Sequence, residues 1–152
     1  MPDALPPERS QTPRQRWMAI LARADAEAVQ TRLGDVPRYT VLRGPEPGLV
    51  MVRGRTGGGG APFNLGEMTA TRCTVRTDTG LVGHAYVAGR NERLAELAAL
   101  ADALLQDPVQ QPALLRQVIE PLAEQQEARR AEIAAKASAT RVQFFAMRNM
   151  RA

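Results

Sequence analysis

The stretch between residues 67 and 88 constrains the fold most, because it reads as one β-hairpin whose register follows from the residues themselves. Two runs of β-forming residues, 67–77 and 81–88, flank Asp78-Thr79-Gly80. A three-residue loop with glycine in the left-handed position is a common hairpin connection. This loop predicts that one face of the hairpin carries small or apolar residues, with the pairs Val75–Gly83, Cys73–Ala85 and Thr71–Val87. The other, mixed face then carries the pairs Arg76–Val82, Thr74–His84 and Arg72–Tyr86. A two-residue loop would mix polar and apolar residues within each pair, so the three-residue loop is favoured.

Two further strands are expected upstream of the hairpin. Residues 39–43 and 48–55 are rich in β-forming residues, and the Gly-Pro-Glu-Pro segment between them is typical of a turn. Strands that are grouped in the sequence and joined by short turns predict an antiparallel sheet.

Helical patterns flank the strands on both sides. The expected start and stop signals are Pro13, Asp25, Gly34, Asn91, Asp107-Pro108 and Pro112, with Pro121 as a kink or a new start. Residues 122–140 are rich in Ala, Glu, Gln and Arg and read as a long, mostly exposed helix. The order helix, strands, helices predicts an α+β fold, with an antiparallel sheet and the N-terminal and C-terminal helices packed on one of its faces.

The domain organisation follows from composition. Residues 1–12 are polar and proline-containing and are expected to be a disordered lead-in. Residues 13–152 are expected to form a single α+β domain. Its last part, about 136–152, combines basic residues with Phe144 and Phe145, which are costly to leave in water, and is interpreted as a docking segment.

The cellular compartment is predicted from sequence features that the chain lacks. No apolar run reaches the length of a membrane span, the N-terminal residues lack the apolar core of a secretory signal, and Cys73 is the only cysteine. A cytoplasmic protein without a membrane partner is therefore expected.

Charge is uneven along the chain. The net charge is +4, and the residues after Glu132 carry Lys136, Arg141, Arg148 and Arg151 without an acidic residue. A basic terminus of this kind can bind nucleic acid or an acidic partner surface, and a solvated terminus is the simpler alternative.

The glycine run Gly57, Gly58, Gly59, Gly60 raises the question of a phosphate-binding loop. A Walker A loop ends in Gly-Lys-Ser/Thr, but here Gly59 is followed by Gly60 and Ala61. A dinucleotide-binding loop opens a helix, whereas the residues after this run look extended. A flexible connection between strands is favoured, and a loop that orders against a ligand or another subunit is the alternative.

The sequence offers few candidate catalytic or metal-binding residues. Cys73 and His84 could form a nucleophile–base pair, but the hairpin register places them on opposite faces of the sheet. One histidine and one cysteine cannot close a zinc site, so neither a catalytic residue nor a metal site is assigned. The mixed face, with Arg72, His84 and Tyr86, could hold phosphate oxygens or meet a partner, and a solvated outer face is the alternative.

Several short motifs, in this order, resemble the PhnG family, the G subunits of the bacterial carbon–phosphorus lyase system. They are Arg14-Gln15-Arg16-Trp17-Met18, Gly48-Leu49-Val50, Thr71-Arg72, Gly89-Arg90 and Thr140-Arg141-Val142-Gln143-Phe144-Phe145-Ala146-Met147. The resemblance runs from about residue 14 to residue 147.

The resemblance implies a subunit of an enzyme complex rather than a free enzyme. Its partners would be the H, I and J subunits of the core complex, with the L protein needed functionally. Together with I, H and L, the G subunit is required to displace adenine from ATP by an alkylphosphonate, giving ribose 1-phosphonate 5-triphosphate. ATP would be a substrate of the complex, the iron–sulfur cluster would belong to a partner subunit, and this chain would carry no cofactor. A small basic nucleic-acid-binding protein and a stand-alone ATP-dependent enzyme are the alternatives.

Overall fold

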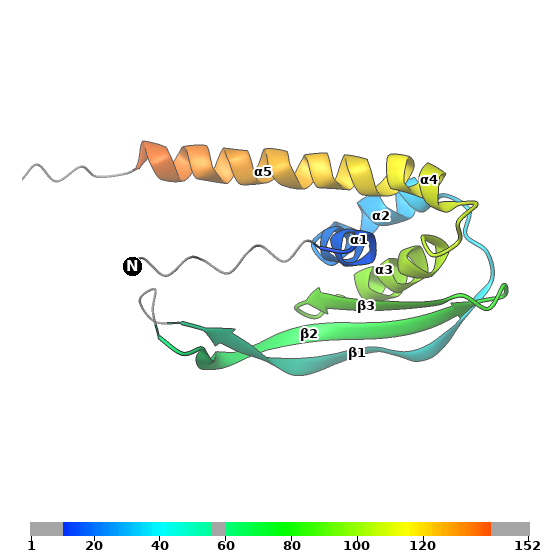
Figure 1. The fold of residues 1–152 in the computed structure, drawn as a ribbon, viewed down its shortest axis with the longest axis horizontal. Coiled ribbons are helices and arrows are strands. Elements are labelled where there is room, and N and C mark those ends of the chain that lie inside the picture. Colours follow the sequence, from blue (N-terminus) through cyan, green and yellow to red (C-terminus); the bar gives the residue numbers. More distant parts are fainter. Residues whose placement is uncertain (1–10, 56–59, 141–152) are drawn as a thin grey trace, which may run out of the picture.

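Three antiparallel strands form a sheet that carries all the described helices on one side (Figure 1). The computed structural model describes residues 11–55 and 60–140. The elements are α1 (Pro13–Leu21), α2 (Ala26–Leu33), β1 (Tyr39–Gly54), β2 (Phe63–Thr77), β3 (Val82–Ala88), α3 (Glu92–Leu104), α4 (Gln111–Leu114), the π-helical stretch η1 (Leu115–Ile119) and α5 (Glu120–Ala139). The strand order is β1-β2-β3, which confirms the predicted α+β fold. No helix in these residues is both long and apolar enough to cross a membrane.

The predicted register of the β2–β3 hairpin is confirmed at all six pairs. The loop closes as expected: Thr77 N–H donates to the carbonyl of Leu81 at 2.9 Å, and Gly80 has φ of 91°. Thr71, Cys73, Val75, Ala85 and Val87 are buried beneath the helices, whereas His84 and Tyr86 are exposed on the other face.

The predicted turn at Gly-Pro-Glu-Pro is wrong, because this segment lies inside one continuous strand, β1. The pairing of β1 with β2 shifts between Val41 and Arg43 and again between Arg43 and Glu46, so Pro45 falls where the strand bulges, whereas Pro47 is paired with Thr71. Proline cannot donate to a ladder and is tolerated in edge strands and bulges, and β1 is an edge strand. The proline-rich signal therefore marks an irregular strand here.

The residues predicted to start and end helices do so in the structure. Asp25 accepts from the backbone N–H groups of Glu27 and Ala28, Asn91 accepts from that of Leu94, and Gly34 ends α2 with φ of 62°. Pro121 lies in the first turn of α5, directly after η1. The long exposed helix predicted for residues 122–140 is confirmed as α5.

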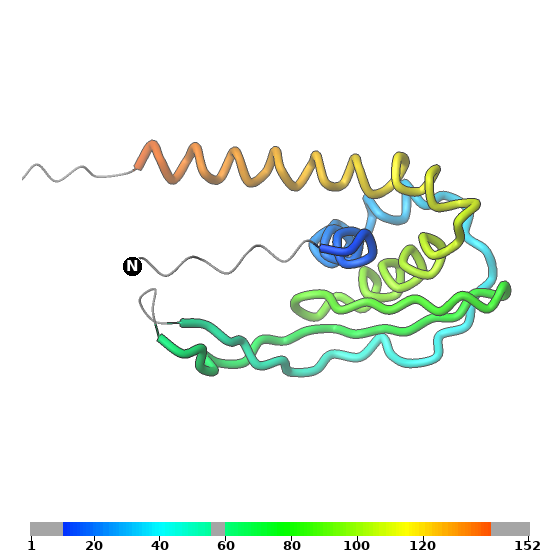
Figure 2. The backbone as a smooth tube through the Cα atoms, in the orientation of Figure 1, coloured from blue at the N-terminus to red at the C-terminus, as the bar shows by residue number. Residues whose placement is uncertain are grey.

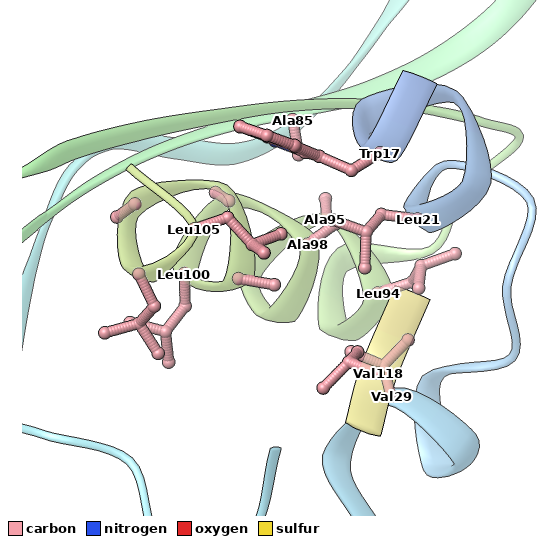
Figure 3. Packing of buried hydrophobic residues seen from close by; sticks show 14 of the residues in the cluster. Trp17, Leu21, Val29, Ala85, Leu94, Ala95, Ala98, Leu100, Leu105 and Val118 are labelled. Atoms are coloured by element: carbon pink, nitrogen blue, oxygen red, sulfur yellow. The ribbon is translucent and has the colours of Figure 1, made fainter. Parts of the chain in front are cut away.

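The core is built around α3, which packs on the inner face of β2 and β3 (Figure 3). Gly83 makes a close approach possible, since a Cβ atom at this position would lie 1.9 Å from the carbonyl oxygen of Ala99. Ala103 is the next neighbour at this crossing. Above α3 lie α1 and α2, and then α5, so the helices form stacked layers over one face of the sheet (Figure 1).

One buried carboxylate ties three elements together. Asp102, in the middle of α3, accepts hydrogen bonds from Arg14 Nε at 3.1 Å, Arg14 Nη2 at 2.7 Å, Trp17 Nε1 at 2.9 Å and the backbone N–H of His84 at 3.0 Å. The hydrogen bond to Asp102 raises the pKa of Arg14, so the guanidinium of this pair stays charged. Sequence analysis did not single out Asp102, although an acidic residue within the apolar stripe of this helix was a usable signal.

We expect Asp102→Ala to lower the free energy of unfolding by about 3 kcal/mol. Arg14 is partly exposed and can turn to water, but the Trp17 indole and the His84 backbone N–H lose their acceptor, at roughly 1–3 kcal/mol each. Urea unfolding followed by circular dichroism measures the change. Glu132→Ala is the control, because it removes an exposed i,i+4 pair with Lys136 worth about 0.5 kcal/mol. Equal losses in the two variants would contradict a role for Asp102 as the link between elements.

Candidate functional site

The three residues predicted on the mixed face of the hairpin do lie together. Arg72 of β2 and Tyr86 of β3 are cross-strand neighbours, and His84 follows on the same face. His84 Nδ1 lies 3.1 Å from the hydroxyl of Thr74. No helix among the described residues covers this face, which is therefore an accessible surface (Figure 1).

Two residues that sequence analysis missed complete this cluster. Glu46 Oε1 accepts from Arg43 Nε at 2.8 Å and from Arg72 Nε at 2.7 Å. Both new residues come from the irregular part of β1, which the sequence predicted as strand end and turn. A shallow hollow of about 130 Å³ is lined by these arginines together with Cys73, Thr74, His84 and Tyr86, although the Cys73 residue is almost fully buried.

The electrostatics of the cluster are those of a surface ion-pair network. The guanidinium groups of Arg43 and Arg72 lower the pKa of Glu46, and Tyr86 and Glu46 raise the pKa of Arg72. An incoming phosphate or carboxylate would have to compete with Glu46 for both arginines. The cluster therefore suits two kinds of ligand equally: a phosphate group, or a partner surface that offers hydrogen-bond acceptors.

Cys73 is separated from this cluster by the sheet itself. Its side chain is buried on the inner face, and burial raises the pKa of the thiol to about 11. A thiol with this pKa is almost fully protonated near neutral pH, and His84 lies on the opposite face. The structure therefore confirms that Cys73 and His84 do not form a nucleophile–base pair.

A second surface lies where β1 and β2 continue past the end of β3. We call residues 49–54 and 63–69 the β-arm, and the tube in Figure 2 shows these two strands running on together beyond β3. Its exposed large apolar side chains are Leu49, Val50, Met51, Phe63, Leu65 and Met68. Val50 and Met68 are paired on one face, and Leu49 and Met51 alternate onto the other.

The exposed apolar side chains of the β-arm indicate a contact with another protein surface. Leu49 is 69% exposed, whereas every described leucine outside β1 and β2 is buried or half-buried. Contiguous exposed apolar surface in a folded protein commonly marks a protein–protein contact. Because both faces of the β-arm are apolar, one flat contact would cover only half of it.

The second projecting element is the distal half of α5. Gln126 Nε2 donates to the carbonyl of Ile20 at 2.8 Å, and all residues from 127 to 140 are exposed, with Ile133 at 58%. An isolated helix of this length is only marginally stable in water. In Figure 1, α5 and the β-arm extend in the same direction from the core.

The remaining predicted site residues are placed only in part. Gly60 is exposed in the connection between β1 and β2, at the end of the β-arm. Gly57, Gly58, Gly59, Arg141, Phe144 and Phe145 lie outside the described residues.

Comparison with known proteins decides the family. The family model for "Phosphonate metabolism protein PhnG" matches residues 12–149. The chain belongs to the PhnG family. A PhnG relative from Rhizobium meliloti (strain 1021), "Alpha-D-ribose 1-methylphosphonate 5-triphosphate synthase subunit PhnG", is 44% identical over 139 residues, covering 88% of this chain and 87% of the relative. The resemblance drawn from the short sequence motifs is confirmed.

For the cluster on the outer face, we expect the pKa of Glu46 to rise towards its ordinary value in Arg43→Ala and, to a smaller extent, in Arg72→Ala. Each substitution removes one hydrogen bond to the carboxylate, and the Arg43 bond contributes the larger effect. The carboxyl ¹³C shift of Glu46, followed by NMR as pH is lowered, measures the change. Since the folded-state pKa lies below the unfolded value, any stabilisation from this network is present above the unfolded pKa and is lost as pH falls through the folded one. An unchanged titration in both variants would show that the network does not form in solution.

Proposed function

We propose that this chain is the G subunit of an alpha-D-ribose 1-methylphosphonate 5-triphosphate synthase and that it acts by binding and ordering catalytic subunits. The observation that carries the assembly role is the β-arm, whose two faces are both apolar and exposed. The relative's printed name and the family match supply the reaction.

The reaction in this proposal replaces the adenine of ATP by an alkylphosphonate. The product is ribose 1-phosphonate 5-triphosphate, and the I, H and L proteins act together with this chain in organic phosphonate catabolism. The H, I and J subunits are its partners in the carbon–phosphorus lyase core complex. The iron–sulfur cluster belongs to a partner subunit, and this chain takes part without a cofactor of its own.

The surfaces described above fit an assembly role on energetic grounds. Apolar surface removed from water stabilises an interface by about 25 cal/mol per Å², and interface cores are depleted of charged residues. The β-arm supplies such a core. The last residues of α5 begin the docking segment 136–152, which continues in the sequence with Arg141, Phe144 and Phe145. The glycine run joins the two strands of the β-arm and is proposed as an interface loop.

The alternative of a small nucleic-acid-binding protein is not supported. The family and the relative are both named for phosphonate metabolism. The main uncovered surface of the described chain, the β-arm, is apolar. Nucleic-acid binding, in contrast, depends mainly on contacts of basic residues with phosphates.

We expect Leu49→Thr combined with Met51→Thr to weaken assembly at least about 30-fold, because buried apolar anchors in interfaces are commonly worth roughly 2 kcal/mol or more. Threonine keeps the strand propensity of these positions. The measurement is co-expression of the tagged chain with the H, I and J subunits, followed by size exclusion with mass analysis.

Val109→Thr is the matched control for the β-arm variant. Val109 is 87% exposed but lies in the turn before α4, away from the β-arm, so its replacement is expected to leave assembly unchanged. Full co-purification of the β-arm double variant would contradict docking through the β-arm. A clean monomer of the unaltered chain, with folded partner subunits present, would contradict the subunit assignment itself.

We also propose that Arg72, His84 and Tyr86 contact a partner subunit or a substrate phosphate. Arg72→Ala is then expected to lower adenine release by the assembled complex, or the yield of that complex, at least tenfold. Arg76→Ala is the matched control, because Arg76 lies on the same face of β2 outside the network around Glu46. Unchanged assembly and unchanged adenine release in Arg72→Ala would remove this role.

A further inference from the structure

The sheet has an open edge at the C-terminal half of β3. Thr77 N–H bonds Leu81 at one end of the β2–β3 ladder, and Gly89 N–H bonds the carbonyl of Thr69 at 2.8 Å at the other end. Bonded pairs alternate in an antiparallel ladder, so the backbone groups of His84, Tyr86 and Ala88 point away from β2. The bond from the His84 N–H to Asp102 agrees with this assignment.

Side chains of α3 and of the turn after it occupy only one half of this edge. Asp102 takes the His84 N–H, and Gln106 Nε2 donates to the carbonyl of Val82 at 2.8 Å. Beyond the His84 N–H, five backbone groups have no hydrogen-bond partner within residues 11–55 and 60–140. They are the carbonyl of His84 and the N–H and carbonyl groups of Tyr86 and Ala88.

The same part of the β3 edge faces α1. Trp17 of α1 lies over Ala85 of β3 (Figure 3), and α1 continues beyond this contact. A hollow of about 220 Å³ lies between α1 and the β3 edge. It is lined by Met18, Ala19, Leu21 and Ala22 of α1, His84, Ala85 and Tyr86 of β3, and Ala98 of α3. The α1 and α3 walls of the hollow are therefore apolar.

We propose that an extended segment of another subunit adds to the sheet as a fourth strand along residues His84–Ala88, with an apolar side chain in the hollow beneath α1. The free donors and acceptors alternate as a partner strand requires, and pockets for alternate side chains give such an addition its specificity. This inference rests on the proposed function, which supplies the other subunits.

A second copy of this chain fits the edge less well than a lone segment. A copy that paired its β3 against this one would bring its own α1 and α3 onto the same face of the joined sheet. The space beside the edge is already bordered by α1 of the first copy, which lines the hollow there. A single extended segment carries no such helices and passes under α1.

Amide hydrogen exchange with residue resolution tests the proposal on the full chain, alone and in the complex with its H, I and J subunits. The amides of Tyr86 and Ala88 are expected to exchange rapidly in the isolated chain and at least tenfold more slowly in the complex. The amides of Ala85 and Val87, which bond β2, serve as the internal control and stay slow in both states.

Two variants separate the backbone from the side chain at the edge. Ala88→Pro removes the outward N–H at an edge position where proline is tolerated, and it is expected to weaken subunit binding at least tenfold. Ala88→Ser keeps the N–H and is expected to change binding by less than threefold, because Ala88 has no part in the cluster around Arg72. Thermal unfolding of each variant verifies the fold, and the exchange experiment decides the matter if the proline variant does not fold.

The remaining outcomes all count against the proposal. A complex that forms while Tyr86 and Ala88 still exchange rapidly overturns the fourth strand and leaves the proposed function intact. Protection in the isolated chain that disappears in a chain ending at Thr140 assigns the edge to its own C-terminal segment, and protection that rises with protein concentration assigns it to a second copy. If folded subunits form no complex, the proposed function and this inference fall together.

Discussion

The buried carboxylate of Asp102 is the interaction on which the arrangement of the other elements depends. It joins Arg14 and Trp17 of α1 to the backbone of β3 through a residue of α3, so three elements share one acceptor group. A buried charge is tolerated only when it is paired and fully hydrogen-bonded. The need to satisfy Asp102 therefore sets where α1 lies over the sheet, and it also closes half of the open β3 edge.

Packing all helices on one side leaves the rest of the sheet available for other contacts. Gly83 admits α3 close to β3, and the helical layers stack above it. The outer face with Arg72 and His84, the open edge of β3 and the β-arm all remain accessible in the described chain. Two of these surfaces lack a complement within the described chain: the edge lacks a partner strand, and the β-arm lacks a covering apolar surface. Together they suit a subunit that is surrounded by partners.

Local chemistry explains which expectations were met. The hairpin register followed from face alternation and Gly80, and the helix ends followed from Asp25, Gly34 and Asn91, because these signals act over a few residues. The turn expected at Gly-Pro-Glu-Pro was wrong because an edge strand can absorb prolines when β2 lies beside it. Of the candidate site, Arg72, His84 and Tyr86 were found from the sequence, while Glu46 and Arg43 were not.

The sequence alone determined the α+β class, the faces of the hairpin, the ends of most helices and, through short motifs, the family. These depend on periodicity, capping and residue identity, which are readable along the chain. Only the tertiary structure decided that Asp102 binds Arg14 and Trp17, that Glu46 bridges Arg43 and Arg72, and that the β-arm and the β3 edge are left uncovered. Those features join residues far apart in the chain or depend on what does not pack against them, so no local pattern encodes them.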